Sequence, residues 1–507
     1  MLTPDYLENL PDALVELWQN VEDDILQDVA RRIKAMDELD PLTPTAAWQA
    51  WRLEQVQAVR QDVTATLAKY SDRSRDNIRQ LLLNAGLATL AADDEIYQAA
   101  GLTPSPVQDS EPLNNLLNAG YQQTLGTWQN LTATTAATVT GAFERRLDRA
   151  WLQVSSGAFD YNTAIKSAVD DLANHMPSVT YPSGHTDTLE VAVRRAVLTG
   201  VNQTAAKLQL ARAEEMGCEF VEVTAHEGAR PEHALWQGKV YHIGGAILYQ
   251  GVWYEDFETA TGYGTGPGLC GWNCRHNFYP FFPGISVPNY TAARLEELNA
   301  RNVEYGGEQY TRYEISQMQR ALERRVRRFK RQYLAEDAAG VDATAAAAKL
   351  RAARKDLNDF VRATGGRNNS ARTSVSGFGR SQTSKATALA KRQARLDTVN
   401  TELNQLRQDG IIKSKGNFVL PPAAPDALIF ERGHVFQRIA EREMSFTDAE
   451  KIISDARFAL RQQNGKVHAY YSADGFVAVR NDGMIYSMGR LDEGGKKLME
   501  VAKRHGF

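Results

Sequence analysis

Apolar residues recur at steps of three and four along most of this chain, and this helical periodicity limits the fold more than any other feature. In the stretch Ala13–Met36 the apolar positions are Leu14, Leu17, Val21, Ile25, Val29 and Ile33. A second run, Thr45–Leu67, begins after two prolines and contains two tryptophans. This spacing places one apolar stripe on each helix, which must be buried against a partner. We therefore predict a helical hairpin at the start of the chain.

Segments rich in proline or glycine divide the 507 residues into five parts. This length predicts about three compact cores. The loop Gly101–Pro112 ends an N-terminal helical domain, 1–104, and a second helical part, 105–217, closes with a predicted helix over Thr188–Met216. Residues 218–290 are rich in glycine and aromatic side chains, with β-type runs at Phe220–Val223 and Ala246–Tyr249. We expect a compact α+β domain there.

Residues 291–420 return to the helical pattern and concentrate positive charge in the segment QRALERRVRRFKRQ, Gln319–Gln332. A polar Gly/Ser-rich stretch follows, which we expect to be a flexible or loop segment, and then a helix over Lys385–Leu406. The proline-rich linker Pro421–Ala427 marks the clearest boundary.

The last module, 425–507, is predicted to have two helices and then a β-meander. The helices are expected at Val435–Arg442 and Asp448–Gln462, with Thr447 and Glu450 as a capping box for the second. Asp-Gly pairs separate three strand-like runs at 466–471, 476–480 and 484–488. The predicted fold class is multidomain and mainly α, with a small central α+β domain and a C-terminal α+β module.

Composition excludes several classes of protein. No window approaches about 18 apolar residues and the acidic start does not resemble a signal peptide, so we expect no membrane segment and a cytoplasmic origin. Three cysteines are too few for a disulfide framework. The net charge of −4 argues against attraction to nucleic acid by the chain as a whole.

The central part holds a group of histidines and cysteines of the types that bind zinc. The candidate metal ligands are His226, His233, Cys270, Cys274 and His276. A C-x3-C spacing falls in the range used for zinc, but no second pair of cysteines completes the set. Buried cysteines and hydrogen-bonded histidines explain the same residues, so we expect no cofactor and keep zinc as the alternative.

The arginine-rich segment is a candidate DNA-binding surface. Its candidate residues are Arg320, Arg324, Arg327, Arg328 and Arg331. Clustered guanidinium groups displace counterions from phosphates without reading base sequence. A solvated helix face, or a face that meets an acidic protein, explains the charge run equally well.

In the last module His434, Arg438 and Arg442 recur every four residues, so a helix would align them on one face. A histidine that moves a proton beside two fixed cations is the set that metal-independent RNA cleavage needs. Tyr486 and Ser487 on the predicted sheet are the candidates for orienting the phosphate. A surface helix with solvated arginines is the competing interpretation.

Four segments together resemble the phage minor capsid protein 2 family, which is similar in turn to Mu-type head morphogenesis proteins. They are HEGARPEHALWQGKVY, GLCGWNCRHNFYPFFPG, YTRYEISQMQRALERRVRRFKRQ and SVSGFGR. The resemblance covers most of residues 1 to 410. It implies a virion protein inside the head beside the portal, present in few copies, with the portal and other head proteins as partners and a role in assembly or genome passage.

The segment GHVFQRIAEREMSFTDAEKIISDA and the meander after it look like the barnase/EndoU/colicin/RelE-like nuclease modules appended to such head proteins. The resemblance implies an RNase toxin, in which His434 acts as acid or base. The alternative is a purely structural head protein whose last module is inactive and serves as an anchor. Sequence similarity of this order supports a fold better than an activity.

Overall fold

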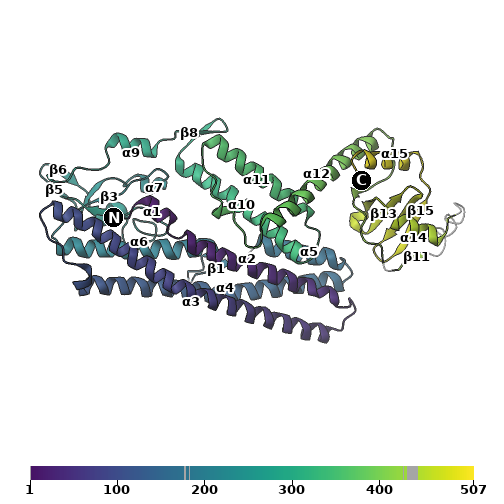
Figure 1. The fold of residues 1–507 in the computed structure, drawn as a ribbon, viewed down its shortest axis with the longest axis horizontal. Coiled ribbons are helices and arrows are strands. Elements are labelled where there is room, and N and C mark those ends of the chain that lie inside the picture. Colours follow the sequence, from purple (N-terminus) through teal and green to yellow (C-terminus); the bar gives the residue numbers. More distant parts are fainter. Residues whose placement is uncertain (1, 176–177, 182, 426, 431–443) are drawn as a thin grey trace. The chain divides into compact units, whose positions relative to one another are not determined.

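The computed structural model describes residues 2–175, 178–181, 183–425, 427–430 and 444–507. It contains two compact units: residues 1–342 with 350–382, and residues 343–349 with 383–507 (Figure 1). The first unit has a helical body and small sheets, and the second is built on a six-stranded sheet. The predicted class, multidomain and mainly α with two α+β parts, is confirmed.

Long helices form the body of the first unit, and α3 and α4 run side by side (Figure 1). Its helices are α1 (Pro4–Asn9), α2 (Asp12–Lys34), α3 (Thr45–Ala99), α4 (Glu111–Ser155), α5 (Tyr161–Asn174), α6 (Leu189–Glu215) and α10 (Arg312–Ala338). A short hairpin, β1 (Ser178–Thr180) with β2 (Thr186–Thr188), precedes α6. The predicted starts of the first two long helices are confirmed, and α3 continues well past Leu67.

One apolar core joins these helices, and pairs of tryptophans lie within it. Trp18 on α2 meets Trp128 on α4 edge-on, with ring centroids 5.2 Å apart, and its indole N–H donates to Ser74. Trp48 stacks on Trp151 at 4.4 Å. Such pairs contribute ~0.5–1.5 kcal/mol beyond the burial of their area. Residues from both predicted helical parts, 1–104 and 105–217, contribute to this single core.

Two glycines allow α4 and α6 to approach each other closely. A Cβ atom at Gly120 would lie 2.1 Å from Thr204 Oγ1, and one at Gly200 would lie 2.3 Å from Thr124 Oγ1. Both hydroxyls donate to backbone carbonyls of their own helices, which fixes the side chains. A larger residue at either glycine would therefore force the two helices apart.

The central α+β part is a small sheet fastened to α6. Strands run in the order β4 (Val240–His242), β3 (Phe220–Val223) and β7 (Phe278–Pro280). Around them lie α7 (Pro231–Ala234), α8 (Phe257–Thr261), α9 (Ala292–Asn299) and the hairpins β5 (Ile247–Tyr249) with β6 (Val252–Tyr254) and β8 (Val303–Tyr305) with β9 (Glu308–Tyr310). The predicted strands at 220–223 and 246–249 are confirmed. Asn202 on α6 donates to the backbone carbonyls of Cys274 and His276 and so anchors the loop before β7.

The polar segment after α11 (Thr344–Thr364), predicted to be a flexible or loop segment, packs against the body in its part up to residue 382. The backbone N–H of Ser376 donates to Asp23 over 2.8 Å, and Lys330 donates to the carbonyl of Thr373. The ring of Phe378 meets Tyr333 edge-on at 5.6 Å. Most of this segment forms neither helix nor strand, yet it contributes contacts to a buried part of α10.

The second unit is a sheet in the order β10–β12–β13–β14–β15–β11 with helices on both faces. Its strands are β10 (Asn417–Val419), β11 (Ile429–Phe430), β12 (Phe458–Gln462), β13 (Val467–Ser472), β14 (Gly475–Arg480) and β15 (Met484–Gly489). The end of α12 (Arg380–Gln408) and α15 (Glu493–Arg504) pack on one face, and α14 (Phe446–Ser454) packs on the other. The unit begins before the linker 421–427 because β10 completes the sheet beside β12.

The three strands of the predicted meander are confirmed as β13, β14 and β15. The prediction of a helix over 448–462 is wrong beyond Ser454, because residues 458–462 form strand β12, whose apolar start is buried. The capping box is also formed by other residues: Ser445 and Asp448, not Thr447 and Glu450, exchange side-chain and backbone hydrogen bonds at the start of α14. The predicted helix Val435–Arg442 lies outside the described residues.

Candidate functional site

The loop before β7 and the short helix α7 bring three predicted metal ligands together. The Nδ1 atoms of His233 and His276 are 3.4 Å apart. Cys274 Sγ lies 3.8 Å from His233 Nδ1 and 3.6 Å from His276 Nδ1. All three side chains are buried, and they are the only such group of three among the described residues. We call these residues the Cys–His cluster.

Hydrogen bonds on the far side of each imidazole determine which nitrogen carries the proton. His233 Nε2 lies 2.8 Å from the carbonyl oxygen of Pro267, and His276 Nε2 lies 2.9 Å from Gln237 Oε1. Both oxygens accept, since Gln237 uses its amide nitrogen to donate to Asn299. Each Nε2 must therefore donate, so each neutral ring presents its Nδ1 lone pair to the centre of the cluster.

Burial keeps the cluster uncharged. Desolvation lowers the pKa of His233 and lowers that of His276 well below its ordinary value, and nearby His226 and Arg275 lower the pKa of His276 further. Desolvation also raises the pKa of the Cys274 thiol. At neutral pH two neutral imidazoles and a thiol thus face one another.

The other two predicted ligands lie beside the cluster. The ring of His226 stacks on that of His276 at 4.4 Å, and its Nδ1 lies 2.8 Å from the carbonyl of Glu227. Burial lowers the pKa of His226 to about 4, and its Nε2 is buried with no hydrogen-bond partner among the described residues. Cys270 is buried with its Sγ 3.6 Å from the carbonyl of His276.

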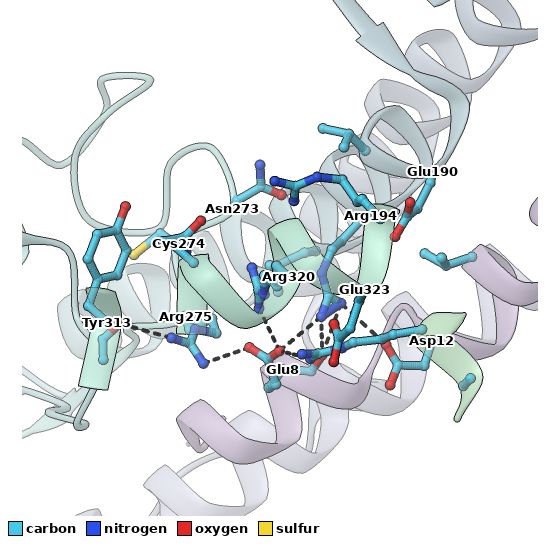
Figure 2. Close-up of a pocket in the computed structure, with 18 of the residues that line it drawn as sticks. Glu8, Asp12, Glu190, Arg194, Asn273, Cys274, Arg275, Tyr313, Arg320 and Glu323 are labelled. Carbon is cyan, nitrogen blue, oxygen red and sulfur yellow. Dashed lines mark hydrogen bonds and ion pairs between the residues drawn. The ribbon is translucent and has the colours of Figure 1, made fainter. Parts of the chain in front are cut away.

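The cluster borders a cavity of about 350 Å³ whose opposite wall comes from the N-terminal helices and α10. Figure 2 shows Cys274 and Arg275 on one side, with Glu8, Asp12 and Arg320 across from them. The lining includes many arginines and few apolar side chains. The cavity is therefore a polar space, suited to water or to a small anionic group.

Glu8 is the hub of the charges in this cavity. Its carboxylate accepts from Arg275 at 2.6 Å, Arg320 at 2.8 Å and Arg372 at 2.5 Å. Arg194 lies 3.1 Å away and completes a set of four guanidinium groups around one carboxylate. Figure 2 labels three of them, Arg194, Arg275 and Arg320, beside Glu8. Burial opposes ionisation of Glu8, but the four arginines, led by Arg275, lower its pKa to about 2. The hub joins α1, α6, the loop before β7 that carries Arg275, α10 and the segment after α11.

Three of the five predicted DNA-contacting arginines form ion pairs with carboxylates of this chain. Arg320 pairs with Glu8, Arg327 pairs with Glu190, and Arg331 pairs with Glu22 at 2.7 Å and Asp23 at 2.5 Å.

The remaining two, Arg324 and Arg328, are exposed and have no carboxylate partner among the described residues. The guanidinium of Arg328 lies over the ring of Phe329 at 4.8 Å, and Arg324 lines the cavity. DNA binding by the arginine helix stays a prediction, which now depends on Arg324 and Arg328.

Only some of the predicted nuclease residues lie within the part of the chain that the structure describes. His434, Arg438 and Arg442 lie outside the described residues. Tyr486 and Ser487 lie on β15 and line a cavity of about 230 Å³, together with Tyr471, Asp492 and other residues of the second unit.

The acidic partners of the arginines were not predicted. Glu8, Glu22 and Asp23 lie on the first two helices, hundreds of residues from the arginines that they neutralise. The one available signal is a carboxylate next to the apolar stripe: Glu22 follows Val21 directly, and the structure buries both Glu22 and the neighbouring Asp23. Acidic groups are almost never buried without a partner, so this placement indicates a cation elsewhere in the chain.

Comparison with known proteins agrees with the resemblance seen in the motifs. The chain is similar to the "Structural protein" of Lactococcus phage LL-H, with 24% identity over 298 residues that cover 56% of this chain and 76% of the relative. It is also similar to the "Structural protein" of Lactococcus phage mv4, with 38% identity over 79 residues that cover 16% of this chain and 55% of the relative. No solved structure matches.

The described part of the chain contains no helix that is long and apolar enough to cross a membrane. The family model for "Phage minor capsid protein 2" matches residues 2–362, which include the helical body, the Cys–His cluster, the Glu8 hub and α10. The match ends before most of the second unit. On this evidence the chain belongs to the phage minor capsid protein 2 family.

Proposed function

We propose that this protein is an internal head component of a tailed phage or prophage that docks beside the portal and assists head assembly and genome packaging or ejection. The observation that supports docking is an exposed apolar patch in the central part. It consists of Leu248, Trp253 and Ile285, which are 66%, 62% and 64% exposed. We call it the hairpin patch.

The geometry of the hairpin shows why these side chains are exposed. Tyr249 and Tyr254 pack on the ring of Phe220, with ring centroids 5.2 and 4.9 Å from it. Leu248 and Trp253 lie directly opposite each other in the register and project from the other face. The turn of the hairpin lies beside the loop of Ile285, since a Cβ atom at Gly284 would be 3.6 Å from Gln250 Oε1.

Exposed apolar surface such as the cross-strand pair of Leu248 and Trp253 marks protein interaction sites, and tryptophan is enriched among the residues that dominate binding. The portal protein is the partner that the proposal commits to, because the family is one of minor capsid proteins. Arg324 and Arg328 are the two exposed candidates of the arginine-rich segment for contact with genomic DNA. The protein then acts through binding, and its central part carries out no reaction.

Replacing Leu248 and Trp253 by serine is expected to weaken binding to the portal protein about 30-fold or more, as the loss of about 2 kcal/mol at a central aromatic residue implies. Binding is measured by co-purification with the portal protein of the same phage, and the copies per purified head by quantitative mass spectrometry. The control replaces Leu42 and Leu152, which are exposed leucines on the helical body, by serine. Equal incorporation of both double variants into heads would contradict the proposal.

We propose as a second function that the C-terminal unit cleaves RNA after delivery into the host. What supports this is the cavity of about 230 Å³ on the sheet face, which Tyr486 and Ser487 of β15 help to line. In this scheme His434 moves the proton of the 2′-hydroxyl, and Arg438 and Arg442 hold the scissile phosphate. No metal takes part in that chemistry.

For the RNase function, His434→Ala is expected to lower the rate of RNA cleavage by the full-length protein at least 100-fold, the range of a lost general acid or base. The matched control is His468→Ala, a change at a histidine on β13 in the same unit. RNA cleavage is followed on a labelled oligonucleotide in the presence of a chelator. Absence of RNA cleavage by the unaltered protein, with no growth defect on expression, would contradict the RNase function. It would favour the alternative, in which this unit is inactive and serves as an anchor.

A further inference from the structure

The geometry points to a Zn²⁺ site in which His233 Nδ1, His276 Nδ1 and Cys274 Sγ are the protein ligands and a water molecule from the 350 Å³ cavity is the fourth. The cavity touches all three residues, so solvent reaches the open position. Zinc is the ion that this mixture of imidazole and thiolate ligands favours. This site is independent of the docking and RNase functions proposed above.

The distances between the three ligand atoms match the edges of a zinc tetrahedron. With Zn–N bonds of about 2.0–2.1 Å and Zn–S bonds of about 2.3 Å, tetrahedral angles place two nitrogens about 3.4 Å apart and nitrogen and sulfur about 3.6 Å apart. The corresponding distances here are 3.4 Å for the two nitrogens and 3.6 and 3.8 Å for sulfur and each nitrogen. A metal ion can therefore enter without rearrangement of the loop.

The hydrogen bonds around the cluster are those of metal-binding histidines. Each ring donates through Nε2, His233 to a backbone carbonyl and His276 to Gln237, which directs the Nδ1 lone pair of each ring at the shared centre. Two lone pairs 3.4 Å apart repel each other unless a cation or a proton lies between them. In a metal-free protein the Cys274 thiol can donate to only one of the two nitrogens.

The backbone that presents these ligands is tightly constrained. Cys270 and Asn273 adopt left-handed conformations with φ of 58° and 54°, which few non-glycine residues do. At Gly268 a Cβ atom would lie 1.9 Å from the carbonyl oxygen of Gly262, so only glycine fits. Unfavourable conformations persist where the surroundings enforce them, and they cluster at functional sites. Zinc would lock this loop to α7 and so to the central sheet.

The experiment measures the zinc content of the full-length protein, purified under reducing conditions without a metal-binding tag, by mass spectrometry of the metal. We expect about one Zn²⁺ per chain, retained through gel filtration, and loss of the ion in Cys274→Ala. Cys218→Ala is the matched control: Cys218 is also buried, but its Sγ contacts the carbonyl of Phe220 outside the cluster, so zinc should be retained. His226→Ala should also retain zinc, because His226 is not among the three ligands.

Co²⁺ replacing Zn²⁺ gives a second measurement on the unaltered protein, so the proposal remains testable if Cys274→Ala does not fold. A thiolate ligand produces an intense sulfur-to-cobalt charge-transfer band, which should be present in the unaltered protein and in Cys218→Ala. Absence of both bound zinc and this band would overturn the site. Equal zinc content in Cys274→Ala would also overturn it, and loss of zinc from His226→Ala would overturn the assignment of water as the fourth ligand.

Discussion

Arg331→Ala is expected to lower the free energy of unfolding of the first unit by about 3–5 kcal/mol, the cost of removing one partner from a buried ion pair. The side chain of Arg331 is only 12% exposed, and those of Glu22 and Asp23 are 4% and 1% exposed. Burial raises the pKa of both carboxyl groups, and Arg331 is the main group that opposes this effect. Without the guanidinium of Arg331, α2 would hold two adjacent buried carboxylates with no strong counterion.

Urea unfolding followed by tryptophan fluorescence measures this change. All eight tryptophans lie between residues 18 and 272, so the signal reports on the first unit and not on the C-terminal unit. The matched control is Arg328→Ala, three residues earlier on the same helix, where an exposed side chain should change stability by no more than about 0.5 kcal/mol. Equal effects of the two substitutions on the free energy of unfolding would show that the ion pairs of Arg331 with Glu22 and Asp23 do not stabilise the contact between α10 and α2.

A double-mutant cycle identifies the pair that carries the effect. Asp23→Ala alone is also expected to destabilise strongly, because Asp23 accepts from both Arg331 and the backbone N–H of Ser376. The double variant should cost less than the sum of the two single variants, by about 0.5–3 kcal/mol, as for other residues in direct contact. Additive effects would place the stabilisation outside the Arg331–Asp23 contact.

The helical body could be predicted from the sequence because its apolar stripes have a single period over long stretches. Val21, Ile25 and Val29 lie on one face of α2, and all three are buried. The prediction was wrong for residues 458–462, where Phe458, Ala459 and Leu460 form an unbroken apolar run in a strand that is covered on both faces. Such a run has no period of two, so it cannot be distinguished from the buried end of a helix.

The candidate site was predictable as a set of residue types and not as a geometry. Cys274 and His276 are two residues apart, but His233 joins them only because α7 and the Pro267 loop fold against β7. Local sequence also gives no means of pairing Glu8 with Arg372. Ion pairs between distant segments depend on the complete packing of the helices, and periodicity describes only which face of each helix is buried.

Glu8→Gln is expected to lower the free energy of unfolding by about 3 kcal/mol at pH 7, because four arginines then share a cavity wall without their common carboxylate. The pKa of Glu8 falls from 4.5 to about 2 in the folded protein. A depressed carboxyl pKa stabilises the folded state fully above the unfolded value. That stabilisation is lost as the pH falls from about 4.5 towards 2.

The same fluorescence-detected urea unfolding, repeated between pH 7 and pH 3, measures this difference between the unaltered protein and Glu8→Gln. The difference should be constant from pH 7 to about pH 5 and should then narrow as the pH is lowered, because protonation removes the same charge that the substitution removes. Glu16→Gln is the matched control, since Glu16 is an exposed glutamate that lines the same cavity and has no ion-pair partner among the described residues. Its effect should stay within about 0.5 kcal/mol at every pH. A Glu8→Gln difference that does not depend on pH would mean that the carboxylate stabilises this unit by packing and not by its charge.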